Sequence, residues 1–246
     1  MLTIYQVGDD QASSTYIRNK LKAIKDAGLE ARHVHLPEET TTEKLWEELM
    51  WDESTAILVQ LPLPKHIDKD AVLKAIGPSQ DIDGLCPFSR HKPLTPCAIM
   101  RWLKEREIKL QGTSVAILGR SNLVGKPLAM MMIDAGATVT VCNSHTQRYK
   151  RDKVCKDAKI VISATGNIKP FSWRGVNDNG GQIFIDVGIN RDAAGKLCGD
   201  IPADIRDWID EVGSECTPVP GGVGRWTVQE LVLRLKEMEG VAINGE

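Results

Sequence analysis

Two side chains that could exchange protons lie one helical turn apart near the start of the sequence. Tyr16 and Lys20 stand four residues apart in TYIRNKLKAIKDAG, so a helix would present both on the same face. A phenol and an amine at this spacing can bind a substrate and accept its proton. Most such pairs, however, belong to a solvated helix surface, and the spacing alone leaves both interpretations open.

Further polar groups stand where buried strands are expected to end. Gln60 lies near the end of the apolar run AILVQL (56–61), where a polar residue usually has a hydrogen-bonding partner. Asp81 and Asp83 belong to the long irregular segment 77–96, although Asp followed by Gly is also an ordinary turn sequence. With the tyrosine–lysine pair, these residues could form an acid–base site at the mouth of a sheet.

A glycine-containing turn in the second half predicts a dinucleotide site. In SVAILGRSNLVGKP an apolar strand runs into Gly119, and Gly125 stands near the start of the next helix. Such a turn lets backbone N–H groups and a helix N-terminus face a pyrophosphate. Ser121 occupies the place of the second glycine in G-x-G-x-x-G, so a tight turn with only a packing role remains the alternative.

The residues after the next strand favour NADP over NAD. An NAD site usually has a carboxylate there, which binds the ribose 2′-OH, but residues 142–146 read CNSHT and contain no acid. Arg120, in the glycine turn, supplies a cation that suits a 2′-phosphate. The alternative is that Arg120 only points into solvent.

Three later segments also place glycine where ligands bind in α/β sheets. SATG (163–166) and IDVGIN (185–190) follow apolar strands, and ligands bind at the carboxyl ends of such strands. The loop TPVPGGVG (217–224) has two adjacent glycines after a proline, which suggests a close approach of backbone to a flat ring. A linker turn explains this loop equally well.

Strand and helix patterns alternate along the chain and position these residues. They predict an α/β fold of two domains: an N-terminal α/β substrate domain, residues 1–110 plus the C-terminal helix 227–246, and a Rossmann-type doubly wound NADP domain, 111–226. A deep cleft between the domains would hold the site. The expected strands are 2–7, 31–36, 56–61, 114–119, 138–142, 160–165 and 183–187. The first helix is expected to have Ser14 or a neighbour as N-cap and Gly28 as C-cap, and further helices are expected at 41–50, 68–76, 99–106, 126–135, 148–158 and 227–238.

Composition narrows the class of protein. The 246 residues have a formal net charge of -2 and 5% aromatic residues, which argues against a nucleic-acid partner. No apolar stretch is long enough to span a bilayer, and the first ten residues do not resemble a signal peptide, so a cytoplasmic enzyme without membrane contact is expected. The six cysteines form no C-x-x-C pair and predict reduced, buried thiols and no metal site.

Eight phrases together resemble the bifunctional methylenetetrahydrofolate dehydrogenase/methenyltetrahydrofolate cyclohydrolase (FolD-type) family. They occur in the family's order and span nearly the whole chain: VGDDQASSTYIRNK, VQLPLP, DIDG, GRSNLVGKP, CNSHT, SATG, IDVGIN and TPVPGGVG. The resemblance implies an enzyme of one-carbon metabolism that oxidises 5,10-methylenetetrahydrofolate with NADP and then hydrolyses the methenyl product to 10-formyltetrahydrofolate. It also implies a homodimer formed through the cofactor domains.

The resemblance assigns roles to individual residues. It implies that Lys20 is the catalytic lysine, that Tyr16 stacks near the folate, that Gln60 hydrogen-bonds the lysine, and that Asp83 holds the pteridine. The residues implied to line the folate cleft are Val59, Leu61, Pro220, Gly221, Gly222, Val223 and Gly224. Those implied to bind NADP are Gly119, Arg120, Ser121, Ser144 and Ile189.

The chemistry of hydrolysis makes a demand on Lys20 that can be stated physically. Water adding to the methenyl cation must lose a proton, but a lysine with an ordinary pKa of about 10.4 is already protonated. Its pKa must fall by roughly 3, equivalent to about 4 kcal/mol, and both burial and a substrate cation act in that direction. Gln60 can accept a hydrogen bond from the amine without adding a negative charge.

Several segments depart from the family pattern and keep two alternatives open. Met1 nearly abuts the first strand, where the family has a helical segment, and the loop after DIDG is shorter than usual. Gln80 stands in place of a lysine, Leu94 in place of a cysteine, and Arg225-Trp226 in place of Pro-Met. The alternatives are a shikimate-type or other two-domain NADP-dependent dehydrogenase, and an inactive folate- or nucleotide-binding module.

Overall fold

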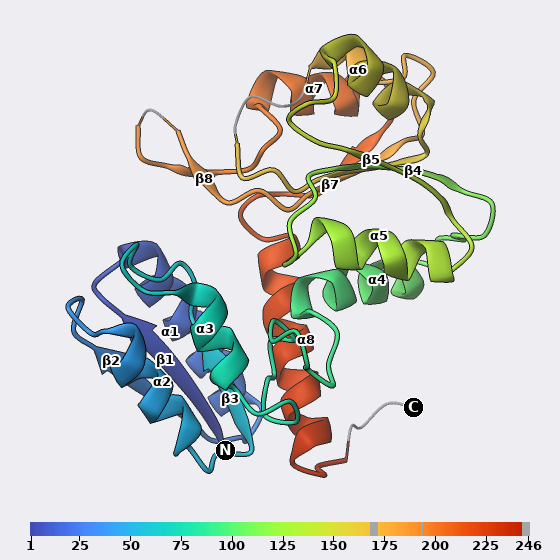
Figure 1. Ribbon diagram of the computed structural model, residues 1–246. Coiled ribbons are helices and arrows are strands. Elements are labelled where there is room, and N and C mark those ends of the chain that lie inside the picture. Colours follow the sequence, from blue (N-terminus) through green and yellow to red (C-terminus); the bar gives the residue numbers. More distant parts are fainter. Residues whose placement is uncertain (168–171, 193, 243–246) are drawn as a thin grey trace. The chain divides into compact units, whose positions relative to one another are not determined.

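The chain forms two compact units in a computed structural model that describes residues 1–167, 172–192 and 194–242 (Figure 1). The first unit comprises Met1–Leu94 and the chain from Val228 on, and the second comprises Thr95–Thr227. The sequence-based boundary at residues 110–111 differs from this division by one helix, α4 (Leu94–Glu105). Ile99 and Leu103 of α4 pack into the core of the second unit, which explains its assignment there.

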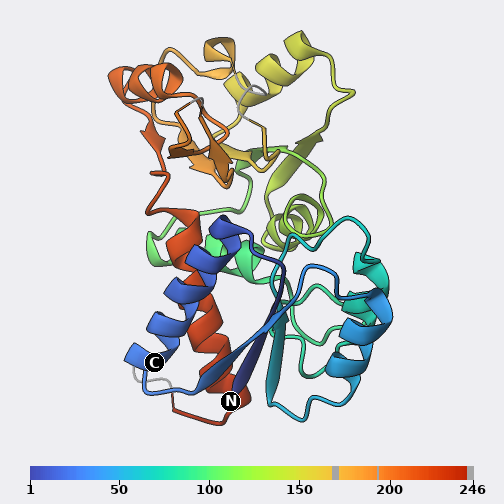
Figure 2. The ribbon, with the colours of Figure 1, turned by 90° about the vertical axis from the view of Figure 1, so that its left-hand side faces the viewer.

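The first unit is a three-layer α/β sandwich around a parallel sheet of order β2-β1-β3. Residues from α1 and α8 share one core with the sheet, and residues from α2 and α3 share the other (Figures 1 and 2). The elements are β1 (Leu2–Val7), α1 (Gln11–Asp26), β2 (Ala31–Leu36), α2 (Thr42–Met50), β3 (Ala56–Val59), α3 (Lys69–Ala75) and, from Val228 on, α8 (Val223–Met238).

Strand β1 is buried at every position because it lies in the middle of this sheet. Leu2 and Ile4 pack on the face that α1 covers, whereas Tyr5 and Val7 pack on the face of α2 and α3. Most of β1 is apolar, as expected for a parallel sheet covered by helices, and the buried Thr3 and Gln6 hydrogen-bond to the side chains of Ser54 and Ser14.

The ends of α1 differ from the sequence-based expectation. The N-cap is Asp10, whose carboxylate accepts a hydrogen bond from the Ser13 backbone N–H at 2.7 Å, and Ser14 lies inside the helix. The C-cap is Ala27, and Gly28 follows it with a φ of 75°. Aspartate and serine are both good N-caps, and the pattern of apolar residues does not choose between two that are close in sequence.

The second unit contains a five-stranded parallel sheet of order β10-β7-β6-β4-β5 and the short antiparallel pair β8-β9. Its elements after α4 are β4 (Ser114–Leu118), α5 (Gly125–Asp134), β5 (Thr138–Cys142), α6 (Arg148–Asp157), β6 (Ile160–Ser163), the 3-10 turn η1 (Trp173–Gly175), β7 (Ile183–Asp186), β8 (Asn190–Arg191), β9 (Leu197–Cys198), α7 (Ala203–Glu211) and β10 (Glu215–Cys216).

Helices cover both faces of this sheet, so the second unit is doubly wound as predicted. Residues of α4 and α5 share a core with one face, and residues of α6 and α7 share a core with the other (Figure 1). The chain leaves β4 toward β5 and then crosses back to β6 on the opposite side of β4. Ligands bind at such a reversal point, at the carboxyl ends of the strands.

Several elements begin or end away from their predicted positions. Strand β3 ends at Val59, so Gln60 and Leu61 lie beyond it, and β6 and β7 also end one or two residues early. Helix α8 begins at Val223 because the Gly222 carbonyl accepts the first N–H groups of the helix. Helix α7, the pair β8-β9 and β10 were not predicted. Helix α7 has only a short apolar repeat, Ile205 and Ile209, in a polar segment.

Candidate active site

Lys20 carries a buried amine at the centre of the first unit's polar site. Its side chain arises from the middle of α1, and the residue is only 3% exposed. The amine Nζ donates a hydrogen bond to the Gln60 side-chain oxygen Oε1 at 3.0 Å. The Gln60 Nε2 in turn donates to the Leu61 carbonyl at 2.8 Å, which turns the amide oxygen toward the amine. The structure thus brings the predicted lysine and glutamine together.

The environment of this amine makes it easier to deprotonate than an amine in water. Burial lowers the pKa of Lys20 to about 8, against an opposing effect of the Asp83 charge. Tyr16, one turn earlier on α1, presents its ring to the ammonium at 4.6 Å from Nζ to the ring centroid. A neutral amide and an aromatic ring accept the amine without a full negative charge, so neither restores the pKa of an exposed lysine.

Asp83 lies on the segment that follows an isolated bridge between Ile57 and Asp81. The neighbouring Asp81 is fully buried, and its carboxylate accepts hydrogen bonds from Gly84 N at 3.1 Å and Cys86 N at 2.7 Å. Asp81 therefore shapes the turn, which leaves Asp83 as the carboxylate that interacts with Lys20. Burial raises the pKa of Asp83, and the charge of Lys20 acts in the opposite direction.

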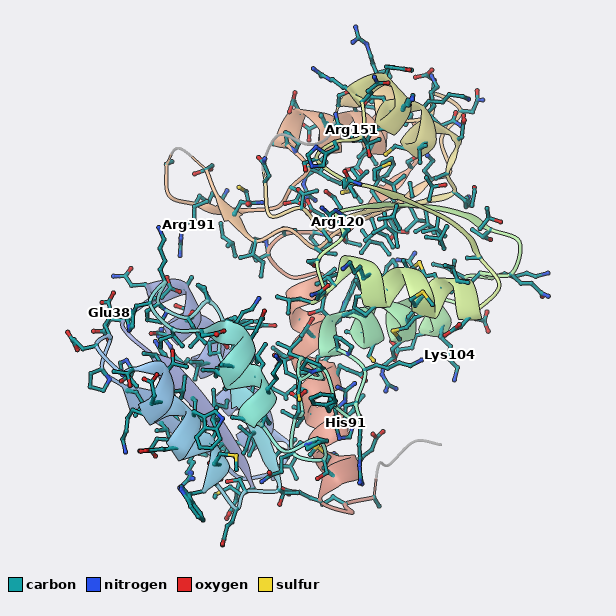
Figure 3. All side chains as sticks on the ribbon, viewed as in Figure 1. Glu38, His91, Lys104, Arg120, Arg151 and Arg191 are labelled. Atoms are coloured by element: carbon teal, nitrogen blue, oxygen red, sulfur yellow. The ribbon has the colours of Figure 1, made fainter. Side chains whose placement is uncertain are left out.

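The glycine turn after β4 has the geometry of a ligand-binding turn. Gly119 has a φ of 113°, and a Cβ atom there would stand 2.3 Å from the Ala164 carbonyl oxygen, so only glycine fits. The side chain of Ser121 accepts from the backbone N–H of Val124 at 3.1 Å. Helix α5 begins at Gly125, directly after this turn. Arg120 belongs to the turn and is exposed (Figure 3). These features fit a pyrophosphate-binding turn.

Two buried aspartates organise the loops beside this turn. The Asp200 carboxylate accepts hydrogen bonds from Thr165 N at 2.7 Å and from Asn190 Nδ2 at 2.9 Å. It also accepts from the Ser163 hydroxyl and the Asn167 backbone, both at 3.0 Å. The loops that follow β6 and β7 are therefore held by one carboxylate. The sequence patterns gave no indication of Asp200, because its partners lie in two other segments, 163–167 and the start of β8.

The neighbouring Asp186 extends the same network. Its carboxylate accepts from the backbone N–H groups of Gly188, Asp200 and Ile201, at 2.9 to 3.0 Å, and pairs with Arg206. Asp186 ends β7, so the carboxyl end of that strand is tied to the segment that carries Asp200. The predicted cofactor residue Ile189 lies between these anchors and is 62% exposed.

The remaining predicted site residues divide between the two units. Val59 is buried in the first unit, where its side chain packs on the side of α2 and α3, and Leu61 is half-buried. Ser144 is exposed after β5. The 220–224 loop belongs to the second unit, and a Cβ on Gly222 would stand 2.5 Å from the Pro218 carbonyl oxygen. The close approach that requires this glycine thus lies within the loop itself.

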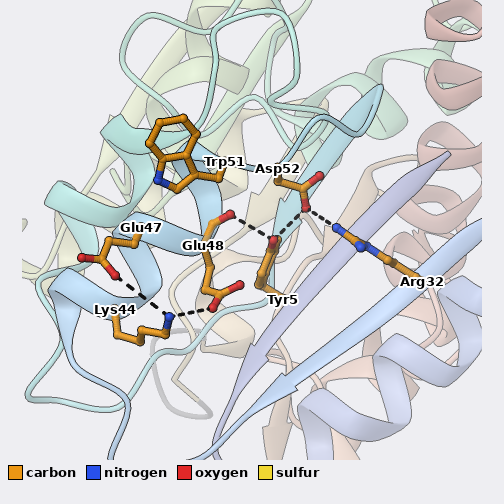
Figure 4. Close-up of a pocket in the computed structure, with 7 residues that line it drawn as sticks. All are labelled: Tyr5, Arg32, Lys44, Glu47, Glu48, Trp51 and Asp52. Carbon is orange, nitrogen blue, oxygen red and sulfur yellow. Dashed lines mark hydrogen bonds and ion pairs between the residues drawn. The ribbon is translucent and has the colours of Figure 1, made fainter.

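A polar pocket of about 320 Å³ lies on the face of the first unit's sheet that α2 and α3 cover, opposite α1 (Figure 4). Burial opposes ionisation of Asp52, but hydrogen bonds from Ser54, Tyr5 and Arg32 outweigh it and lower the pKa of Asp52 to about 2. Since this carboxylate is fully paired, and Tyr5 packs on the side opposite α1, we interpret the network as structural. The pocket is lined by Tyr5, Arg32, Lys44, Glu47, Glu48, Trp51 and Asp52.

Among the described residues, no three His, Cys, Asp or Glu side chains are grouped as a metal site would require. In that part of the chain, no helix has both the length and the apolarity to cross a membrane. All six cysteines are free; Cys86, Cys142 and Cys155 are buried and the other three half-buried.

Comparisons with known proteins match two consecutive parts of the chain to one family. A family model described as the catalytic domain of tetrahydrofolate dehydrogenase/cyclohydrolase matches residues 1–83, and the model of its NAD(P)-binding domain matches residues 93–240. The bifunctional protein FolD of Agathobacter rectalis is 46% identical over 244 residues, which cover 94% of this chain and 85% of that protein.

Solved structures give the same result. The bifunctional FolD enzyme of Campylobacter jejuni superposes with a TM-score of 0.87 at 37% identity, over 97% of this chain and 87% of that one. The Trypanosoma brucei methylenetetrahydrofolate dehydrogenase-cyclohydrolase, solved with NADP and an inhibitor, gives 0.88 at 33% identity, over 96% and 85%. Shikimate 5-dehydrogenase of Thermus thermophilus, at 16% identity and a TM-score of 0.61, shares the fold alone. The chain belongs to the tetrahydrofolate dehydrogenase/cyclohydrolase family.

Proposed function

We propose that this protein oxidises 5,10-methylenetetrahydrofolate with NADP and hydrolyses the methenyl product to 10-formyltetrahydrofolate. The observation that carries the proposal is the buried amine of Lys20, with its pKa lowered to about 8 and its hydrogen bond to Gln60. An amine in this state can exchange a proton near neutral pH, which an ordinary surface lysine cannot. The family relationship supplies the substrate class.

Hydrolysis places the proton acceptor at a defined atom. As the oxygen of water bonds to the methenyl carbon, one proton of the water passes to the neutral Lys20 amine. When the carbon–nitrogen bond of the tetrahedral species breaks, a proton must reach the departing ring nitrogen, and the protonated amine can supply it. The methenyl cation itself disfavours a second positive charge nearby and so lowers the pKa of Lys20 further.

The neighbours of Lys20 hold the amine and the folate in place. Gln60, fixed by its own bond to the Leu61 carbonyl, directs an acceptor at the amine. We assign Tyr16 to stacking near the folate and Asp83 to binding the pteridine, where a carboxylate can accept from ring N–H groups. Leu61, the backbone of Val59 and the Pro220, Gly221, Gly222, Val223 and Gly224 loop are proposed to contact the folate as well, since the Val59 side chain packs toward α2 and α3.

The second unit supplies the cofactor residues in this proposal. The left-handed Gly119 and the start of α5 suit a pyrophosphate, and the exposed Arg120 and Ser144 suit a 2′-phosphate. Ser121 shapes the turn, and Ile189 offers an apolar surface to the cofactor. When bound, NADP accepts the hydride from the methylene carbon. The protein's task in that step is alignment of the two carbons.

We further propose a cytoplasmic homodimer that associates through the cofactor units. Strand β5 is an edge of the five-stranded sheet, and an edge strand offers unpaired backbone groups to a second copy. Val141 on this strand is 40% exposed, and Met130 and Ile133 on the adjacent α5 are 58% and 50% exposed. An apolar surface beside a free strand edge suits a partner of the same kind.

An absorbance assay for methenyltetrahydrofolate formation tests the proposed function. The wild-type protein is expected to give the signal with NADP and a weaker one with NAD. In a second assay, hydrolysis of methenyltetrahydrofolate should fall by roughly 100-fold or more in Lys20→Met, because a positioned proton acceptor contributes about this much. Folate binding should largely survive. The matched control is Lys22→Met, an exposed lysine on the same helix.

The alternatives give different results in the same assays. Hydrolysis at the wild-type rate in Lys20→Met would remove this amine from the mechanism. Binding of folate and NADP without any methenyl signal would identify an inactive binding module. A nicotinamide signal with another substrate and none with methylenetetrahydrofolate would indicate a different dehydrogenase.

A further inference from the structure

Arg234 is a buried cation on α8 that the sequence patterns did not identify. It is 6% exposed, and its Nη1 donates to the Ile82 carbonyl at 2.9 Å and to the Lys92 carbonyl at 2.7 Å. Glu230, one turn earlier and also 6% exposed, stands 3.8 Å from Nη2. A guanidinium is rarely buried without a definite arrangement of acceptors, so these contacts fix its position.

The two carbonyls mark the base of the loop that carries Asp83. Ile82 immediately precedes Asp83, and Lys92 lies where the loop returns toward α4. The two sides of this loop lie close together: a Cβ on Gly84 would stand only 2.6 Å from the Lys92 carbonyl. A single guanidinium that binds both sides therefore holds the loop closed beside Asp83.

The charge of Arg234 also acts on this site. Burial raises the pKa of Asp83 and the Asp81 charge raises it further, whereas the charges of Lys20 on α1 and Arg234 on α8 both lower it. His91 lies next to α8 (Figure 3), and burial and the charge of Arg234 both lower its pKa, with Asp81 and Glu237 acting in the opposite direction.

We propose that Arg234 is a positioning residue of the hydrolytic site, which holds the Asp83 loop through two carbonyls and places a second cation on the loop that carries this carboxylate. This rests on the proposed function, because it assigns Arg234 to the same site. Arg234 acts through Asp83 and does not touch the reacting atoms. Two cations, one from α1 and one from α8, then share one carboxylate. The Lys20 amine can therefore lose its proton without leaving Asp83 as a lone buried charge.

Two substitutions separate the charge of Arg234 from its hydrogen bonds. Arg234→Gln removes the charge but keeps an N–H group for a carbonyl, whereas Arg234→Lys keeps the charge and loses the planar fork. Removal of a positive charge disfavours the carboxylate, so Arg234→Gln should raise the pKa of Asp83. Arg234→Lys should leave that pKa close to the wild-type value. Lys236→Met removes a charge from the same helix and serves as the matched control.

The primary measurement is a carbon-13 NMR titration of the Asp83 carboxyl in the substrate-free protein, assigned with Asp83→Asn. We expect the midpoint to move up by about half a pH unit or more in Arg234→Gln, equivalent to roughly 0.7 kcal/mol, and to stay in place in Arg234→Lys and Lys236→Met. An unmoved midpoint in Arg234→Gln, or equal shifts in both Arg234 variants, would overturn the proposal. If Arg234→Gln does not fold, Arg234→Met, which removes the same charge and suits a buried position, takes its place, and an unmoved midpoint in that variant overturns the proposal.

A second measurement separates this proposal from the proposed function. In the hydrolysis assay Lys20 sets the acid limb of kcat/KM, so the effect on Asp83 is read from KM at lower pH. There KM for methenyltetrahydrofolate should rise in Arg234→Gln and not in Arg234→Lys, because Asp83 binds the pteridine, while NADP binding stays unchanged. A wild-type protein without hydrolysis would contradict the proposed function, yet the NMR titration would still decide the role of Arg234. An active wild type whose KM at low pH is the same in all variants would contradict the role of Arg234 alone.

Discussion

The buried Lys20 amine destabilises the folded protein when it is protonated. Its pKa is about 8 in the folded state against 10.5 when unperturbed, so at neutral pH the folded chain holds a proton that burial disfavours. By linkage this difference is worth about 3 kcal/mol below pH 8. The penalty declines as pH rises from 8 to 10.5, because the folded state gives up that proton before the unfolded state does.

Lys20→Met should therefore stabilise the protein at neutral pH. We expect its free energy of unfolding at pH 7 to exceed that of the wild type by up to about 3 kcal/mol, less roughly 1 kcal/mol for the lost bond to Gln60. The gap should shrink between pH 8 and 10.5. Denaturant unfolding of Lys20→Met, the wild type and Lys22→Met across this range checks the sign; a gap that widens with pH would contradict the linkage.

Single residues also mark how far the sequence leads to the site. Lys20 and Gln60 became candidates through their settings, a helix face and the end of an apolar strand, and the family resemblance gave them their predicted roles. Arg234 and Asp200 were not, since Arg234 binds backbone carbonyls far away in sequence and Asp200 binds a mixture of backbone and side-chain groups from two loops. A buried charge that binds backbone leaves no spacing pattern.

At the scale of elements, the loops after β6 and β7 depend on Asp200. Its carboxylate accepts at both oxygens, and the amide of Asp200→Asn could accept at only one. We expect this variant to raise the KM for NADP about tenfold or more, since hydrogen bonds to a charged group contribute 1.5–3 kcal/mol.

Hydrolysis of directly supplied methenyltetrahydrofolate is the activity with which the NADP effect of Asp200→Asn is compared. It depends on first-unit side chains and should stay within about twofold of the wild type, and the exposed Asp204→Asn should change neither activity. Equal losses of both activities in Asp200→Asn would mean that the carboxylate supports the whole fold and not the cofactor loops in particular.

The strands and long helices were predictable because their apolar periods are strong. Strands β1, β2 and β5 match the expected ranges residue for residue. The helix ends were less accurate: Asp10 and not Ser14 caps α1, and α4 begins at Leu94 despite Pro96, since proline is tolerated in a first turn. Helix α7 was missed because two buried isoleucines are too short a signal.

At the scale of the molecule, the strand order of the second unit's sheet reverses at β4. The sequence predicted the fold class and not this strand order. The sequence predicted two α/β domains, and the family relationship and the topology confirm that class. It did not predict that α4 packs with the second unit, because the partners of Ile99 and Leu103 lie on α5 and β4, well along the chain. The cleft between the domains stays a prediction.

The proposed homodimer gives a test at the same scale. Sedimentation equilibrium at micromolar concentration should find a dimer for the wild type and a monomer for Val141→Lys, since a charge on the edge strand blocks pairing. Met50→Lys alters an equally exposed apolar residue of the first unit and should leave the dimer intact. A monomeric wild type, or a dimer in Val141→Lys, would contradict association through β5.

The central claim concerns one nitrogen, and it can be titrated directly. Proteins labelled with carbon-13 at lysine Cε give one signal per lysine, and the Lys20→Met spectrum identifies the signal of Lys20. The account predicts a midpoint near pH 8 for Lys20 in the substrate-free protein, well below the 10.5 of an unperturbed lysine. A midpoint near 10.5, together with the chemical shift of a solvated ammonium, would contradict it.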